Sequence, residues 1–153
     1  MGKINMNRVL LGGLAAGVVI DVIEGLVNGV LLTDQYAAAM QALNKSAAFS
    51  TGQIVTFNVI GLLIGILAVR LYAAIRPRYG AGPNTAMRAG LAMWAIGSLM
   101  PGLGMIVLDL FPIQLMAIGM VVGLIELVLA ALVGAYVYKE EPEGATRAAA
   151  ARA

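Results

Sequence analysis

The stretch IQLMAIGMVVGLIELVLAALVGAYVY, residues 113–138, contains a single charged side chain, Glu126, and is otherwise almost wholly apolar. At a rise of about 1.5 Å per residue, a helix of this length crosses the roughly 30 Å of hydrocarbon in a bilayer. The stretch therefore predicts a transmembrane helix that carries one carboxyl group at membrane depth.

Three further stretches have the same character, so we predict spans at about 9–32, 54–75, 87–110 and 113–138. The whole chain is 61% hydrophobic and 12% charged, whereas soluble domains average about 45–50% and about 25%. We expect an all-α polytopic membrane protein whose four transmembrane helices form a bundle. The bundle would occupy residues 1–138, and residues 139–153 would form a disordered cytoplasmic tail.

A secretory signal peptide is the rival interpretation of the N-terminus, because Lys3 and Arg8 precede the first apolar run. That run is longer than the apolar region of a signal peptide and contains two acidic residues. A retained transmembrane helix is therefore the favoured interpretation.

Basic residues predict the topology, because they concentrate in cytoplasmic connections. Nine of the ten fall on one side of the predicted spans, and Lys45 is the exception. Both termini and the central connection are therefore expected in the cytoplasm. The nine are Lys3, Arg8, Arg70, Arg76, Arg78, Arg88, Lys139, Arg147 and Arg152.

The connections also carry structural signals. Residues 33–47 have an apolar stripe at helical spacing, which predicts a short outer interfacial helix or a cover over the bundle mouth. Ser50 and Gln53 have the spacing of a capping box at the start of the second span. Residues 77–85 are rich in proline and glycine and predict a tight loop, and Phe111-Pro112 predicts a sharp turn.

The chain has no cysteine and no histidine. Thiolate zinc sites, iron–sulfur clusters, histidine-ligated haem and Ser-His triads are therefore excluded. No nucleophile–base pair or basic stripe interleaved with aromatics is visible. We therefore expect no enzyme activity, no catalytic residue, no cofactor, no metal and no nucleic-acid partner.

Small residues recur at intervals of three and four along the predicted spans and so share one face of each helix. In lipid, such faces allow backbones to approach closely and pack. The packing positions that this pattern indicates are Gly13, Gly17, Gly61, Gly65, Gly119 and Gly123.

Three acidic residues lie on the same faces: Asp21 and Glu24 in the first span and Glu126 in the fourth. All three come out at roughly 18–22 Å from the cytoplasmic edge at about 1.5 Å per residue. Asn58 of the second span is somewhat further out. An ionisable group at this depth is costly and indicates a functional site.

The third span should kink or break near this depth, at Pro101, Gly102 and Gly104, because proline removes a backbone donor. Carbonyls freed by a break must find partners or line a wet cavity. Broken helices that face buried acids occur in the midplane ion sites of transporters.

Two interpretations of the acids remain open. They can be protonated groups that hydrogen-bond across helices or dock a partner helix, in a structural or accessory membrane protein. Alternatively, Glu24 and Glu126, assisted by Asp21, can bind and release protons or a small cation during transport. A hard-metal site is disfavoured, because three carboxylates on two helices do not complete a coordination shell.

Four stretches resemble a family of small, uncharacterised bacterial integral membrane proteins with four helices. They are RVLLGG at 8–13, VIEG at 22–25, LYAAIRPRYG at 71–80 and LVGAY at 132–136. The resemblance covers nearly the whole chain except the tail. It implies a location in the bacterial inner membrane and no particular activity.

A looser similarity to small multidrug transporters rests on a membrane-embedded Glu in the first helix and a Trp in the third, here Glu24 and Trp94. This chain is longer and has extra acids and an additional outer segment. Besides the lipid bilayer, the expected partner is a second copy in a homodimer or another membrane protein, because four short helices enclose little space.

Overall fold

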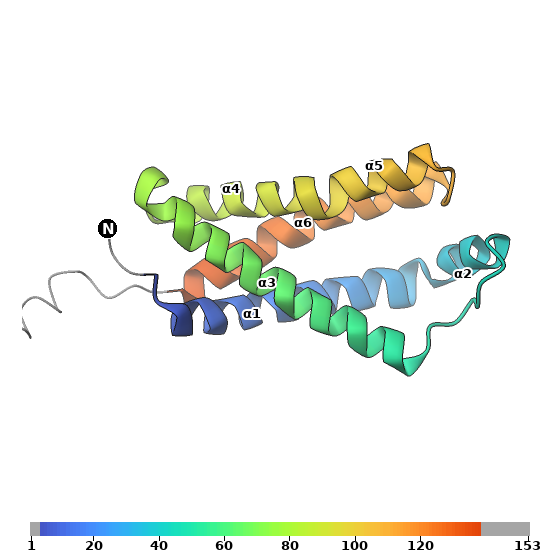
Figure 1. Ribbon diagram of the computed structural model, residues 1–153, viewed down its shortest axis with the longest axis horizontal. Coiled ribbons are helices and arrows are strands. Elements are labelled where there is room, and N and C mark those ends of the chain that lie inside the picture. Colours follow the sequence, from blue (N-terminus) through green and yellow to red (C-terminus); the bar gives the residue numbers. More distant parts are fainter. Residues whose placement is uncertain (1–3, 139–153) are drawn as a thin grey trace, which may run out of the picture.

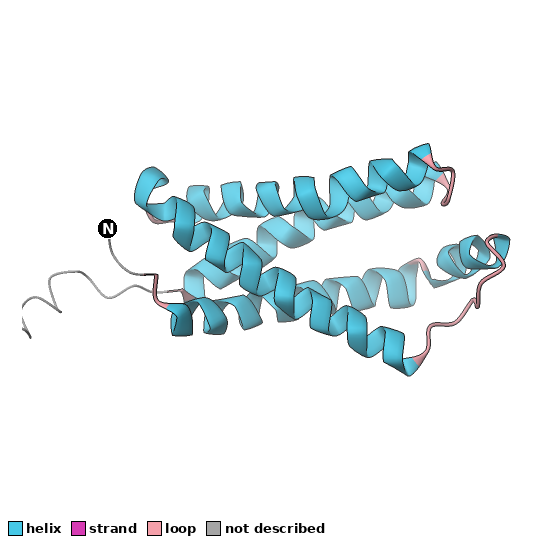
Figure 2. Ribbon diagram, viewed as in Figure 1, coloured by secondary structure: helices cyan, strands magenta, loops and turns pink. Residues whose placement is uncertain are grey.

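The computed structural model describes residues 4–138, and all regular structure within that range is helical (Figure 2). The predicted tail at 139–153 lies outside the described residues. In chain order the elements are α1 (Met6–Leu26), η1 (Val27–Leu31), α2 (Thr33–Ala42), α3 (Thr51–Tyr79), α4 (Pro83–Trp94), η2 (Ala95–Leu99), α5 (Met100–Val107) and α6 (Ile113–Val137). The two segments labelled η are π-helical turns.

Four continuous helices are long and apolar enough to cross a membrane, which confirms the predicted fold class. They run over Met6–Leu31, Thr51–Tyr79, Pro83–Val107 and Ile113–Val137. Each bound lies within four residues of the predicted one. The capping box is confirmed at the start of α3, where the Ser50 Oγ accepts from the Gln53 amide at 3.3 Å and the Gln53 Oε1 accepts from the Ser50 amide at 2.8 Å.

The predicted loop from Pro77 to Thr85 is wrong over most of its length. Helix α3 continues through Pro77 to Tyr79, and α4 already begins at Pro83, which occupies the first turn of that helix. The intervening turn is held by two side chains. The Gly82 amide donates to the Tyr72 hydroxyl at 3.2 Å, and the Thr85 hydroxyl donates to the Tyr79 carbonyl at 3.3 Å. These bonds allow a shorter turn than composition suggests.

The helices form two arms, one made by α1 and α2 and the other by α4, α5 and the start of α6, and α3 crosses from one arm to the other (Figure 1). The arms meet at one end of the bundle and diverge toward the other. Helix α1 packs against α3 and α6, and α4 packs against α6, whereas α5 makes fewer contacts with α6. The start of α1, the α3–α4 turn and the end of α6 lie at one end, which we call the terminal end. The other end, called the α2 end, holds α2 and the α5–α6 turn.

Close packing at the crossing of α1 and α3 depends on glycines. A β-carbon on Gly13 would lie 2.5 Å from the Ile66 Cα, and one on Gly17 would lie 2.5 Å from the Leu62 Cα. Gly65 lies directly against the backbones of Gly13 and Gly17. The two helices can cross here only because side chains are missing, as small-residue motifs in membranes generally permit.

The outer surface of the bundle is strongly apolar. Val107 is 84% exposed, Leu31 is 69% exposed and Ile96 is 68% exposed, and many other large apolar side chains of the spans are similarly uncovered. Contiguous exposure on this scale is rare in water-soluble monomers. It is the expected surface of helices that contact lipid.

The predicted break at Pro101–Gly104 is wrong in position, because the irregularity lies just before the proline. The helix of the third span continues to Val107, and the backbone widens into the π turn η2 at Ala95–Leu99. The Met100 amide donates to the Ala95 carbonyl, five residues back. Proline clashes with the carbonyl four residues before it, so a wider turn at this point accommodates the ring of Pro101.

Candidate functional site

A cavity of about 470 Å³, the inner cavity, lies between the diverging arms in the half of the bundle near the α2 end. Every long helix contributes to its lining. The residues that matter for its chemistry are Glu24, Asn28, Tyr36, Phe57, Ser98 and Phe111. Glycines and methionines from the third and fourth spans line much of the remainder.

The carboxyl groups of Glu24 and Glu126 lie close enough across α1 and α6 to interact. Their surroundings differ. Glu24 lines the inner cavity and its side chain is exposed there, whereas Glu126 is only 3% exposed and lies behind it. Glu24 is therefore the member of the pair that meets the cavity, and Glu126 is its buried partner.

The Asn28 side chain, one turn further along, donates from Nδ2 to the Glu24 carboxyl group. The Glu126 Oε2 atom is buried without a hydrogen-bond donor. Two carboxylates in contact repel strongly when both are charged. The contact is therefore stable only when the pair holds at least one proton.

The inner cavity, where Glu24 lies, has an acidic and otherwise uncharged lining within the described residues. Among the described residues that line the inner cavity, none is Lys or Arg. A carboxyl pair without a cationic partner can neutralise its charge only with protons or with a bound cation.

Asp21 lies close enough to Glu126 for their charges to interact, but it does not line the inner cavity. Its carboxyl group lies against Gly61 of α3. Asn58, which was predicted somewhat further out, is exposed and donates to the Ile54 carbonyl of its own helix at 2.8 Å. The structure therefore brings Glu24, Glu126 and Asp21 together but leaves Asn58 outside the group.

The third span contributes Pro101 and Gly102 to the inner cavity, whereas Gly104 has no neighbour within 4 Å of a β-carbon and does not line it. Ser98 of η2 lies against Gly123 of α6, with its Oγ 2.6 Å from where a β-carbon would be. Gly119 is more loosely covered, since its nearest neighbour is the Tyr36 hydroxyl at 3.9 Å.

Both π turns lie beside the site, which sequence patterns did not predict. Turn η1 carries Asn28, and turn η2 carries Ser98. The Thr33 hydroxyl donates to the Asn28 carbonyl at 3.2 Å and satisfies part of the irregular backbone. Single π turns within α-helices are often found at functional sites.

Two aromatic residues have different roles. Trp94 donates from Nε1 to the Met120 carbonyl at 2.8 Å, so it joins the third and fourth spans. Tyr36 of α2, which was not among the predicted site residues, reaches into the inner cavity. Burial, and next the nearby Glu24 carboxylate, raise the pKa of the Tyr36 phenol above its usual range. The apolar stripe of residues 33–47 was the sequence feature that could have indicated Tyr36 as a site residue.

The acids do not form a recognisable metal centre. Within residues 4–138, no group of three or more His, Cys, Asp or Glu side chains is arranged to hold a metal ion.

No protein-family model, curated protein or solved structure matches this chain.

Proposed function

We propose that this protein is a small multi-pass carrier of the bacterial inner membrane that exchanges protons for a small cation at the Glu24–Glu126 pair. One observation carries the proposal. Two carboxyl groups from different helices meet at a cavity whose lining within the described residues has no basic side chain. An unpaired ionisable site inside a membrane protein is costly, and transport is a reason to retain one.

The exchange balances in charge and atoms. The Glu24–Glu126 pair carries one negative charge when it holds one proton, and it is neutral when it holds two. A cation that enters the inner cavity replaces a proton on the pair, and the released proton leaves through the same cavity. Glu24, which faces the cavity, would make the first contact with the cation, and Asn28 would orient its carboxyl group.

A structural or accessory role is the second candidate, and the Glu24–Asn28 bond favours it. This bond gives the Glu24 carboxyl group a polar partner within its own span, beside Glu126 of α6, without any ligand. In this case the pair remains protonated, and the protein supports a partner helix or a second copy of itself.

The two candidates can be separated in proteoliposomes that contain a pH-sensitive dye. Gradients of Na⁺, K⁺ or tetraethylammonium are imposed, and proton movement is recorded for the wild type, Glu24→Gln and Glu126→Gln. Asp34→Asn is the matched control, because Asp34 lies on α2 outside the inner cavity. Thermal unfolding in detergent shows whether each variant retains its fold.

For the carrier, we expect cation-driven proton movement that both glutamine variants abolish and Asp34→Asn preserves, with unfolding temperatures unchanged. Glutamine keeps the shape of the side chain but cannot release a proton. The proposal fails if no cation produces proton movement above empty liposomes, or if the glutamine variants transport normally.

A further inference from the structure

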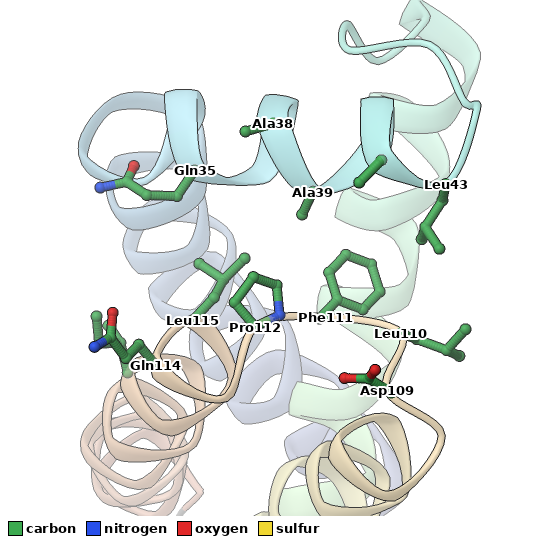
Figure 3. Close-up of a pocket in the computed structure, with 12 residues that line it drawn as sticks. Gln35, Ala38, Ala39, Leu43, Asp109, Leu110, Phe111, Pro112, Gln114 and Leu115 are labelled. Carbon is green, nitrogen blue, oxygen red and sulfur yellow. The ribbon is translucent and has the colours of Figure 1, made fainter.

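The two ends of the bundle carry opposite charge. Figure 3 shows Asp109 of the α5–α6 turn, which lines a cavity of about 690 Å³ between that turn and α2. Asp34 lies in the first turn of α2, and Lys45, beyond α2, is the one basic residue of the α2 end within residues 4–138. At the terminal end, the same part of the chain has basic side chains and no acidic one: they are Arg8, Arg76, Arg78 and Arg88.

One of these arginines is held against an aromatic ring. The Arg88 guanidinium lies over the ring of Tyr79, 4.5 Å from its centroid, which is within the range of a cation–π contact. Both side chains are exposed, and so is Arg78, which directly precedes Tyr79. We call Arg78, Tyr79 and Arg88 the arginine–tyrosine cluster.

The arginine–tyrosine cluster lies at the level of the lipid headgroups. Thr51–Tyr79 and Pro83–Val107 are both long and apolar enough to cross a membrane, so the turn between them lies at the membrane surface. Arg88 lies about 7.5 Å along α4 from its start at Pro83, yet its guanidinium reaches back to Tyr79 at the end of α3. The charge of Arg88 is therefore directed toward the surface, as basic side chains near helix ends generally are.

The chemistry of the arginine–tyrosine cluster fits an anionic headgroup. A guanidinium stacked on a ring keeps its N–H donors in its own plane, where they match phosphate oxygens in pairs. Two exposed arginines repel the amine of a zwitterionic headgroup, whereas an anionic headgroup carries no amine to compensate its phosphate. Charge complementarity therefore favours an anionic phospholipid.

We propose that Arg78, Tyr79 and Arg88 bind the headgroup of an anionic phospholipid, with Arg88 stacked on Tyr79 and donating to the phosphate. None of these three residues lines the inner cavity, so the proposal does not depend on the carrier function. A lipid bound here would hold the α3–α4 turn at the surface of one leaflet.

Native mass spectrometry in a neutral detergent counts the lipid molecules bound to the full-length protein. The wild type is titrated with phosphatidylglycerol or phosphatidylethanolamine, which share the phosphate and differ in net charge. Arg88→Gln removes the stacked cation. Arg8→Gln is the matched control, because it removes the same charge at the same end but from α1, on the other arm (Figure 1). Tyr79→Leu and Tyr79→Phe test the ring.

We expect the wild type to bind phosphatidylglycerol more tightly than phosphatidylethanolamine. Arg88→Gln should weaken phosphatidylglycerol binding about fivefold, the contribution of one basic residue near an anionic lipid surface, and Arg8→Gln should leave it unchanged. Tyr79→Phe keeps the ring and should bind as the wild type does. Tyr79→Leu should weaken binding about two- to fivefold, as for the loss of an exposed cation–π contact.

Equal binding of the two lipids to the wild type would overturn the proposal, and this comparison depends on no variant. Equal losses in Arg88→Gln and Arg8→Gln would also overturn it, because the lipid would then respond to total charge and not to the arginine–tyrosine cluster. Unchanged binding by Tyr79→Leu would show that the ring does not position Arg88. The substituted side chains are all exposed, and thermal unfolding in lipid-free detergent checks that each variant retains its fold.

Discussion

The carboxyl group of Asp21 lies against Gly61, where an added β-carbon would collide with Oδ1 and approach Cγ to 3.1 Å. Gly61→Ala should therefore displace the Asp21 side chain at a cost below that of overpacking in a core, about 1–3 kcal/mol, because Oδ1 is the free end of a flexible side chain. In Asp21→Ala/Gly61→Ala, the collision is absent, so we expect the unfolding temperature in detergent to recover.

Gly104→Ala is the control for this substitution, because the β-carbon would have no neighbour within 4 Å. Alanine is the better helix former by about 1 kcal/mol, so this variant should be at least as stable as the wild type. If Gly65→Ala, whose β-carbon would collide with the Gly17 backbone nitrogen, were equally well tolerated, α3 would not pack against α1 as described.

At the residue scale, the helical spacing of the acids was enough to predict that Asp21, Glu24 and Glu126 lie on inward faces. It could not predict that Glu24 faces the inner cavity while Glu126 is buried behind it, because this depends on how far the arms diverge. Asn58 was predicted near the depth of the acids, somewhat further out. It lies on an exposed face of α3 instead, and its side chain hydrogen-bonds within that helix.

At the element scale, the π turn at Ala95–Leu99 makes room for Pro101. Deletion of Ile96, an exposed residue of that turn, should restore an ordinary helix and force the proline ring against a carbonyl. We expect a loss of about 3 kcal/mol or more, as for proline inside a helix. Adding Pro101→Ala to the deletion should restore most of the stability in a thermal unfolding assay.

If the double variant remained as unstable as the deletion alone, the π turn would serve another purpose, such as the placement of Ser98.

Neither π turn was predicted, because a π turn has the same composition and nearly the same periodicity as the α-helix around it. The capping box of α3 was predicted, because it depends on two side chains at a fixed spacing.

Helix α2 is joined to α6 through Leu115, which is 3% exposed. Leu115→Ala should weaken this cluster by about 2–5 kcal/mol, the cost of truncating a buried leucine. Since α2 has few other contacts, its amides should exchange hydrogen faster while those of α3 do not change. Ile118→Ala is the control, because Ile118 lies one turn along the same helix but is 44% exposed. Uniform acceleration across α2 and α3 would contradict a separately mobile α2.

At the scale of the whole molecule, four apolar runs were sufficient to predict four membrane helices, because length and hydropathy determine spanning. The divergence of the two arms was not predictable in this way. Close contacts occur at the terminal end, where a β-carbon on Gly12 would lie 2.6 Å from the Gly134 carbonyl oxygen. Larger side chains, such as Phe57 and Phe111, line the inner cavity between the diverging helices.

The orientation of the molecule decides which compartment the α2 end faces. The distribution of basic residues indicates a cytoplasmic terminal end, so Ser46→Cys, beyond α2, should react with a membrane-impermeant maleimide in intact cells. Asn84→Cys lies beside the α3–α4 turn at the terminal end, and it should react only after the membrane is permeabilised. Both positions are exposed, so the comparison reports sidedness and not burial. Reaction of Asn84→Cys alone would place the α2 end in the cytoplasm and reverse this orientation.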